Sequence, residues 1–339
     1  MKDSKDFGIL PDHLPEKARE AVSLMNEFGK AKRPFLFIID FLMLEPMVIP
    51  LDQVDDNRIL YHVCGKTNVN QNYPKLSASF RFNKKPPSFS SYKKAFDLAM
   101  EHLLYGNSYL LNLTMPSELD CDLSLKEIFY RSHAACKLWF DDRFVLFSPE
   151  LFVRITNGRI ESHPMKGTID ASIPDAESKI LQDPKETAEH NTIVDLIRND
   201  LNRIAENVRL ESFRYITPVV TRNRTLLQVS SSVVGNLNKN FQHRIGELIF
   251  SLLPAGSISG APKKKTVEII LEAEPYDRGY YTGVFGIFDG QDLDSGVMIR
   301  FIEKKDGKLW FKSGGGITIN SRCEAEYQEL IDKVYLPFS

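Results

Sequence analysis

The sequence predicts an α+β fold with mainly antiparallel sheets. Strand-like segments recur along the chain with helices between them, but strand and helix do not alternate regularly as they do in parallel α/β proteins. An Asn-Gly dipeptide at 157–158 separates two strand-like stretches, which is typical of a β-hairpin. No Gly-, Pro- or Ser-rich linker divides the 339 residues, and 42% of them are hydrophobic, so we expect one domain with a substantial core.

The first 90 residues carry the fewest clear patterns. Residues 35–40 resemble a strand, and the Lys-, Pro- and Ser-rich residues 84–94 a surface loop. Apolar side chains at helical spacing predict a helix over 92–105, which Gly106 and Asn107 end. A strand over 108–114 follows.

The rest of the chain alternates strands and helices. We expect strands over 143–155, 159–168, 226–234, 281–289, 295–303 and 309–313. We expect helices over 186–205 and 241–252, from near Pro262, and over 324–334.

Composition excludes several classes of protein. The formal charge of −2 does not favour binding to nucleic acid or to an anionic membrane. The N-terminus lacks the apolar region of a signal peptide, and the apolar run over 35–49 contains Asp40, Glu45 and Pro46. The four cysteines are far apart in the sequence, which is typical of reduced thiols in a cytoplasmic protein.

The predicted hairpin could place the side chains of Glu150 and Lys166 opposite each other. A three-residue loop over 157–159 places them opposite each other on one sheet face, with Cβ atoms roughly 5 Å apart. A two-residue loop points them to opposite faces. In the first register they could form a functional pair or an ordinary cross-strand ion pair.

Two predicted helices each carry two glutamates at i, i+3 spacing, namely Glu186 with Glu189 and Glu326 with Glu329. This spacing puts both carboxylates on one helix face. Four converging carboxylates would suit Mg²⁺, which prefers oxygen ligands. The alternative is a pair of ordinary helix-surface interactions, of Glu186 with His190 and of Glu329 with Lys333.

Two glycine-containing segments could approach a ligand closely. Residues 256–263, Gly-Ser-Ile-Ser-Gly-Ala-Pro-Lys, join a loop to a helix start, where free N–H groups favour an anion, although a plain helix start would look the same. Gly314, Gly315 and Gly316 follow a strand and allow either close backbone approach or a bulge. We interpret Arg198, Asn199 and Asp200 as a structural charge network.

Taken together, these motifs resemble the chorismate-utilising enzymes, which include anthranilate, aminodeoxychorismate, isochorismate and salicylate synthases. The resemblance covers the chain from about residue 90 to the end. It rests on these segments in the family's order: 148–150 (Ser-Pro-Glu), 164–168 (Pro-Met-Lys-Gly-Thr), 185–190, 193–200, 256–263, 274–275, 278–279, 281–283, Arg300, 314–316 and 326–333.

The lysine in Pro164-Met165-Lys166-Gly167-Thr168 is typical of aminodeoxychorismate synthase component I, since anthranilate synthases typically have alanine there. The resemblance therefore implies that Lys166 attacks C2 of chorismate while Glu150 protonates the departing C4 hydroxyl. Ammonia then adds at C4 and expels the lysine, on the route to p-aminobenzoate and folate. Anthranilate, isochorismate or salicylate formation is the alternative.

The resemblance also implies a binding site. Mg²⁺ would be held by Glu189 and Glu329, with Glu186 and Glu326 bridging through water. The implied chorismate-binding residues are Thr168, Ser257, Ser259, Gly260, Lys263, Tyr281, Arg300, Gly314, Gly315 and Gly316.

The family fold is a sandwich of two packed antiparallel sheets with helices outside. Against it we expect a single catalytic domain over 1–339, with a reduced N-terminal portion over 1–90 and the family core over 91–339. We expect no fused lyase or amidotransferase domain. We therefore expect ammonia to come from a separate glutamine amidotransferase subunit.

Overall fold

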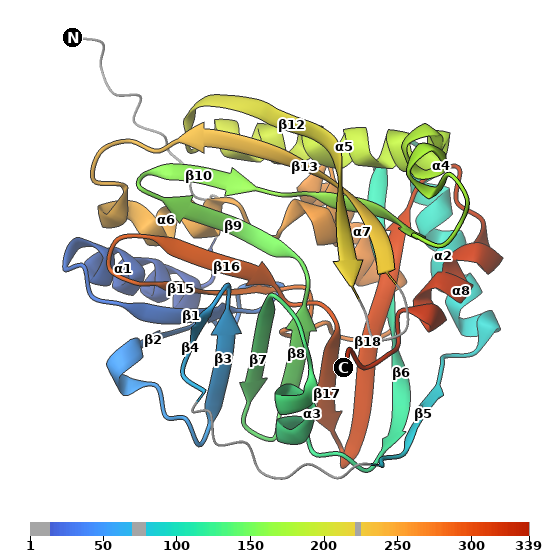
Figure 1. Cartoon of the computed structure of the whole chain (residues 1–339), viewed down its shortest axis with the longest axis horizontal. Coiled ribbons are helices and arrows are strands. Elements are labelled where there is room, and N and C mark those ends of the chain that lie inside the picture. Colours follow the sequence, from blue (N-terminus) through green and yellow to red (C-terminus); the bar gives the residue numbers. More distant parts are fainter. Residues whose placement is uncertain (1–13, 70–78, 221–224, 339) are drawn as a thin grey trace.

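The computed structural model describes residues 14–69, 79–220 and 225–338, and within these ranges the chain forms two antiparallel sheets with helices on their outer faces (Figure 1). The first sheet has the order β11-β13-β10-β9-β16-β15-β1-β2, with β12 also paired to β13. Its strands are β1 (Phe35–Ile39), β2 (Met47–Pro50), β9 (Leu151–Thr156), β10 (Arg159–Ser162), β11 (Met165–Asp170), β12 (Glu206–Val220), β13 (Thr225–Asn236), β15 (Val284–Phe288) and β16 (Leu293–Val297).

The second sheet has the order β14-β6-β18-β17-β8-β7-β3-β4, with β5 paired to β6. Its strands are β3 (Ile59–Val63), β4 (Lys66–Thr67), β5 (Phe82–Lys85), β6 (Leu110–Cys121), β7 (Cys136–Phe140), β8 (Phe144–Ser148), β14 (Gly260–Ala261), β17 (Phe301–Lys305) and β18 (Lys308–Ile317). All the strand pairs in both sheets are antiparallel, as the sequence predicted.

The helices cover the outer faces of the two sheets. They are α1 (Glu16–Lys30), α2 (Phe89–Leu104), α3 (Leu125–Arg131), α4 (Ala176–Gln182), α5 (Pro184–Asn202), α6 (Ile245–Ser251), α7 (Lys263–Ala273) and α8 (Cys323–Asp332), with 3₁₀ turns at Leu51–Gln53, Phe241–Arg244 and Gly256–Ile258. None of the helices in the described ranges is long and apolar enough to cross a membrane.

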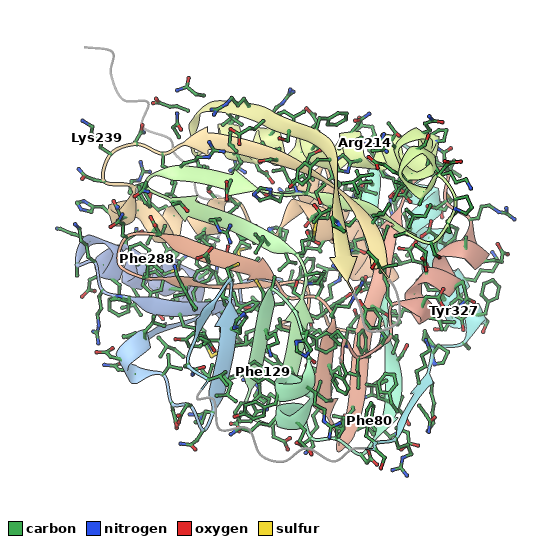
Figure 2. The ribbon with its side chains drawn as sticks, in the orientation of Figure 1. Phe80, Phe129, Arg214, Lys239, Phe288 and Tyr327 are labelled. Atoms are coloured by element: carbon green, nitrogen blue, oxygen red, sulfur yellow. The ribbon has the colours of Figure 1, made fainter. Side chains whose placement is uncertain are left out.

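Strand β1 shows how the core is layered. Its five residues are all buried, and successive side chains point to opposite faces of the sheet. Phe35, Phe37 and Ile39 pack under the outer helices, whereas Leu36 and Ile38 pack between the two sheets. Further apolar clusters lie under α2, α7 and α8 and under α3. Phe288 and Phe129, labelled in Figure 2, belong to two of these outer cores.

Two strands that we predicted as continuous are each divided between the sheets. The predicted strand 143–155 breaks at Pro149 into β8 of the second sheet and β9 of the first, and 295–303 breaks before Phe301 into β16 and β17. The breaks lie side by side, because Val297 donates a backbone hydrogen bond of 3.1 Å to Glu150 O, and Phe147 one of 3.2 Å to Arg300 O. Glu150 and Arg300 therefore both stand where the chain crosses between sheets.

Other differences are local. Residues 84–94 are not a loop, because Ser88 caps α2, whose first residue is Phe89, and β5 ends at Lys85. Helix α1 and the long strand β12 were not predicted. Strand β18 extends past the predicted 309–313 through the three glycines to Ile317.

Candidate active site

Lys166 projects from β11 toward helix α5. Its Nζ lies 3.6 Å from Glu189 Oε2, and the two side chains are 20% and 8% exposed. Helix α5 begins at Pro184 because Asp183 caps it, accepting a 2.9 Å hydrogen bond from the Glu186 backbone N–H. This start places the Glu186 and Glu189 pair beside β11.

Arg214 of β12 holds the end of α4 against the start of α5. Its guanidinium donates hydrogen bonds to Ile180 O (3.0 Å), Leu181 O (2.7 Å) and Thr187 Oγ1 (2.7 Å). The residue is labelled in Figure 2, beside α4 and α5. One side chain therefore ties the end of α4 to the first turns of α5, which carry the two glutamates.

The three glycines of β18 stand between Lys166 and helix α8. They pair with β6, at Thr114, Leu113 and Asn112, and continue beyond the last β17 pair, which joins Lys312 to Phe301. A methyl group on Gly316 would lie 2.9 Å from Lys166 Nζ and 3.9 Å from Glu189 Oε2. A methyl group on Gly315 would lie 3.1 Å from Glu329 Oε1 and 3.5 Å from Glu326 Oε2. Gly316 therefore faces Lys166 and Glu189, whereas Gly315 faces Glu329 and Glu326.

The carboxylates are not gathered into one cluster. Within the described ranges, no group of three or more His, Cys, Asp or Glu side chains is placed to hold a metal ion. Glu189 instead pairs with Lys166, and Glu329 Oε1 accepts a 2.5 Å interaction from Lys333 Nζ. The carboxylate oxygens of the four glutamates are the kind of ligand that a hard cation such as Mg²⁺ prefers. The magnesium site therefore stays a prediction, in which both lysines would have to release their carboxylates.

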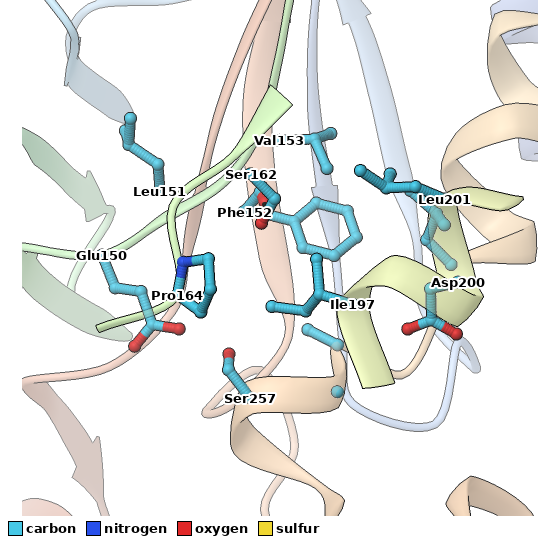
Figure 3. A pocket seen from close by; sticks show the side chains of 13 residues that line it. Glu150, Leu151, Phe152, Val153, Ser162, Pro164, Ile197, Asp200, Leu201 and Ser257 are labelled. Carbon is cyan, nitrogen blue, oxygen red and sulfur yellow. Dashed lines mark hydrogen bonds between the residues drawn. The ribbon is translucent and has the colours of Figure 1, made fainter. Parts of the chain in front are cut away.

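Glu150 faces three cations. Burial raises the pKa of its carboxyl group, against the opposing effects of a hydrogen bond with Ser257 and of the charges of Lys166, Arg300 and Lys333. Figure 3 shows the Glu150 carboxylate directed toward Ser257, beside a small cavity that apolar residues of β9 and α5 line. Burial therefore favours the protonated form of Glu150, and the three cations favour the ionised form.

The hairpin register that we considered for this pair needs correction. Arg159 pairs with Thr156 and Ile160 with Ile155, so the loop has two residues. Asn157 and Gly158 have φ of 51° and 79°, the positive values that a two-residue hairpin turn requires. The three-residue register is therefore wrong. However, β10 ends at Ser162 and β11 pairs with β13, so the hairpin register does not determine how Lys166 faces Glu150.

Arg300 adopts a left-handed backbone conformation, with φ of 51°. A non-glycine residue in this region is often held there by its surroundings at a functional site. Its side chain stacks on Tyr335, with 5.3 Å from Cζ to the ring centroid, and its buried Nε makes no hydrogen bond within the described residues. Its charge acts on Glu150, Tyr281 and Lys333.

Lys333 is the residue that the sequence reasoning missed. We had considered it only as a helix-surface partner of Glu329. Its Nζ also donates a 2.8 Å hydrogen bond to Gly314 O, and burial lowers its pKa, with Arg300 and Lys166 acting in the same direction. Lys333 ends the segment 326–333, which is one of the motifs that resemble the family, and this position could have identified it as a candidate site residue.

The segment 256–263 divides into two parts. Ser257 contacts Glu150, as described above. By contrast, the buried Ser259 hydroxyl donates to Ala255 O (2.8 Å), and Lys263 Nζ pairs with Asp200 Oδ2 (2.6 Å) and donates to Leu252 O (2.6 Å). The ion pair of Asp200 agrees with its interpretation as part of a structural charge network, and Lys263 belongs to the same network. Contact of Ser259 and Lys263 with a substrate stays a prediction.

The remaining predicted positions lie as follows. Gly260 has φ of 139°, and a methyl group there would lie 1.9 Å from Leu110 O, so only glycine fits beside β6. Tyr281 is buried, and burial raises the pKa of its hydroxyl. Thr168 is exposed on β11, opposite Gln228. The ligand contacts of these three residues stay predictions.

Comparison with known proteins identifies the family of the chain. A family model described as chorismate binding enzyme matches residues 52–338. An uncharacterized PabA-like protein of Haemophilus influenzae is 50% identical over 312 residues, which cover 92% of this chain and 94% of that protein. Aminodeoxychorismate synthase component 1 of Klebsiella aerogenes is 32% identical over 346 residues, covering 97% and 74%. Anthranilate synthase component 1 sequences match over shorter parts.

The fold is also similar to solved structures. The menaquinone-specific isochorismate synthase MenF of Escherichia coli superposes with a TM-score of 0.70 at 17% sequence identity, covering 93% of this chain and 80% of that one.

Proposed function

The chain belongs to the family of chorismate-binding enzymes, and we propose that it aminates chorismate at C4 as an aminodeoxychorismate synthase component 1. The observation that carries the proposal is the position of Lys166. Its amine lies beside Gly316, and its charge reaches the carboxyl group of Glu150. The proposed nucleophile and the proposed proton donor are thus close enough for the charge of one to act on the other.

The cations that surround Glu150 suit the proposed substrate. Chorismate carries two carboxylates, and Arg300, Lys333 and Lys166 concentrate positive charge beside the open edge of β18. Arg300 can present its planar guanidinium to one carboxylate, and the glycine backbone allows the ring to approach β18 closely. We assign Tyr281 and Gly315 to the same carboxylate-binding region.

Covalent catalysis by Lys166 requires its unprotonated amine. The amine must therefore leave its ion pair with Glu189 and lose a proton before it attacks. The lone pair of Nζ forms a bond to C2, the two conjugated ring double bonds shift from C1=C2 and C5=C6 to C6=C1 and C4=C5, and the C4–O bond breaks. Glu150 gives its proton to the departing hydroxide, which leaves as water.

The second half of the reaction restores the enzyme. Ammonia forms a bond to C4, both ring double bonds shift back to C5=C6 and C1=C2, and the C2–Nζ bond breaks, so the lysine amine is regenerated. The proton released by the ammonia nitrogen returns to the Glu150 carboxylate. The net change replaces the C4 hydroxyl with an amino group and leaves the enolpyruvyl group in place.

In this proposal Glu189 and Glu329 would hold Mg²⁺ directly, with Glu186 and Glu326 supporting it through water. The bound cation would supply positive charge for the ring carboxylate. Ammonia would come from a separate glutamine amidotransferase subunit, and ammonium salts would replace that subunit in an assay.

Product identification tests the proposal. The purified chain is incubated with chorismate, Mg²⁺ and an ammonium salt, and the products are separated and identified by mass. We expect a compound that retains the enolpyruvyl group and carries an amino group in place of the hydroxyl. Pyruvate with anthranilate or salicylate, or isochorismate alone, would instead assign the chain to another activity of the family. If calorimetry shows no Mg²⁺-dependent binding of chorismate, the chain would instead be a non-catalytic partner of an amidotransferase subunit.

A further inference from the structure

Two cysteines that are distant in the sequence meet at the edge of the second sheet. Cys64 and Gly65 form the turn between β3 and β4, with φ of 50° and 91°. The Cys64 backbone N–H donates a 2.9 Å hydrogen bond to Ala135 O, which places the turn beside the first residue of β7, Cys136. Cys136 is paired with Val63, the residue before Cys64, and both cysteines pack in the core between the two sheets.

The two thiols differ in their surroundings. Cys64 is half-buried, whereas Cys136 is buried. Arg154 of β9 hydrogen-bonds the Cys64 sulfur, and its Nε pairs with Asp294 Oδ1 at 2.6 Å. Lys66 Nζ lies 3.1 Å from Asp294 and 2.7 Å from Asp289. A hydrogen bond with Cys136, aided by Arg154, lowers the pKa of Cys64 to about 7, although burial and the charge of Asp294 oppose this.

We infer that Cys64 and Cys136 form a redox-active dithiol, which peroxides oxidise to an intramolecular disulfide. The accessible Cys64 thiolate attacks one peroxide oxygen, so that an S–O bond forms, the O–O bond breaks and hydroxide leaves as water. The Cys136 thiol then loses its proton and attacks the Cys64 sulfur. The S–S bond forms, the S–O bond breaks and a second water leaves, so two thiols and one peroxide give one disulfide and two waters.

The dithiol adjoins the segment that carries Glu150. Cys136 pairs with Ser148, whose Oγ accepts a 3.1 Å hydrogen bond from the Glu150 backbone N–H. The Cys136 sulfur also packs closely on Gly296, where an added methyl group would lie 2.9 Å from it. Gly296 precedes Val297, which binds Glu150 O. Oxidation changes the sulfur position under this segment, so we expect the disulfide form to turn over more slowly.

Peptide mass spectrometry tests the inference. The reduced full-length chain is treated with hydrogen peroxide, the remaining thiols are blocked under denaturing conditions, and the chain is digested. We expect a linked peptide pair that contains Cys64 and Cys136. Cys64→Ser abolishes it and Cys323→Ser leaves it intact, whereas Cys136→Ala leaves a sulfenic acid on Cys64 that dimedone traps. Failure of the wild-type chain to form the linked pair would overturn the inference.

Alkylation of the untreated chain provides a second readout that does not depend on Cys136→Ala folding. Burial raises the pKa of Cys121 and of Cys323, so at pH 7 we expect Cys64 to react with iodoacetamide about 10-fold or more faster than either. Equal rates for the three thiols would contradict the assignment of Cys64 as the reactive one. An unchanged turnover of the fully cross-linked chain would contradict the link to Glu150.

Discussion

At the scale of single residues, the proposed chemistry divides between a lysine and a glutamate with opposite requirements. Lys166 has to become neutral before it attacks, and Glu150 has to hold a proton until the C4 hydroxyl leaves. The pocket supplies the second condition directly, because burial raises the pKa of Glu150. The three cations nearby oppose this effect, so the pKa of Glu150 should also respond when the anionic substrate binds.

The Glu150 assignment predicts a specific pH dependence. A proton donor loses activity as pH rises through its pKa, and for Glu150 this pKa lies above the usual carboxyl value. Glu150→Gln should lower kcat about 10²–10⁴-fold and remove that alkaline decline. Glu272→Gln, an exposed glutamate with a side chain 59% exposed, is the control and should retain both. An unaltered pH–kcat profile in Glu150→Gln would refute the assignment.

The same raised pKa sets the sign of a stability effect. A carboxyl group with a raised native pKa binds more protons in the folded state than in the unfolded state. The contribution of Glu150 to the free energy of unfolding should therefore fall as pH rises from the unfolded pKa to the folded one. Glu150→Gln should remove this part of the pH dependence in denaturant titrations.

The motifs could identify most of the candidate residues, but not the contacts that their side chains make. Lys166, Glu150 and the four glutamates were predicted from sequence order, and the structure brings them to one region. The ion pairs of Lys166 with Glu189 and of Lys263 with Asp200 are contacts between separate elements, which local patterns do not contain. The meeting of Cys64 with Cys136 was missed for the same reason.

At the scale of elements, the site depends on strands that leave one sheet and join the other. Because β17 begins at Phe301, the glycines of β18 keep an open edge toward β11. Hydrophobic periodicity predicts both strands of such a crossing, and Pro149 limits regular pairing at the first break, but neither signal shows that the two parts join different sheets. The predicted strands 143–155 and 295–303 failed at these points.

Filling the space beside Gly316 should affect Lys166 directly. Gly316→Ala places a methyl group 2.9 Å from Nζ, and this flexible side chain can move away at small cost to folding. Displacing the reacting atom by about 1 Å should reduce kcat/KM about 10²-fold. Gly307→Ala is the control, because its φ of 74° adds strain while no atom lies within 4 Å of the added methyl group. Gly307→Ala should lose stability and keep activity. Full activity in Gly316→Ala, with a loss of activity in Gly307→Ala, would contradict the account.

The link between α5 and α7 should act on stability. Lys263 and Asp200 are only 15% and 12% exposed, so Lys263→Met leaves a mostly buried carboxylate without its cation. We expect a loss of about 3–5 kcal/mol in denaturant unfolding. The double variant Lys263→Met with Asp200→Asn should recover part of it. A raised KM for chorismate with unchanged stability would instead support the predicted substrate contact of Lys263.

At the scale of the whole molecule, both sheets contribute residues to the candidate site. β11 and α5 supply Lys166 and one carboxylate pair, while β18 and α8 supply the glycines and the other. The family resemblance predicted this two-sheet sandwich, and the observed sheet orders confirm it. The N-terminal portion contributes to the same fold, because β1 lies between β15 and β2 within the first sheet, and the family match begins at residue 52.

A ligand that bridges the two halves should stabilise the folded chain. At a Mg²⁺ concentration 100-fold above Kd, binding adds about 2.7 kcal/mol to the free energy of unfolding. We expect Mg²⁺ with chorismate to raise Tm and a chelator to reverse the shift. Glu189→Gln and Glu329→Gln should abolish it, whereas Glu324→Gln, an exposed neighbour on α8, should retain it. A shift of equal size in all three variants would place the cation elsewhere.

The covalent step is the central claim, and intact-protein mass spectrometry tests it most directly. Without ammonia, the chain is incubated with chorismate and Mg²⁺ and then denatured by acid. We expect an adduct with the mass of chorismate less one water, on the peptide that contains Lys166. Lys166→Arg keeps a cation for Glu189 but has no nucleophilic amine, so it should form no adduct and no product. Amination by Lys166→Arg at the wild-type rate would contradict the account.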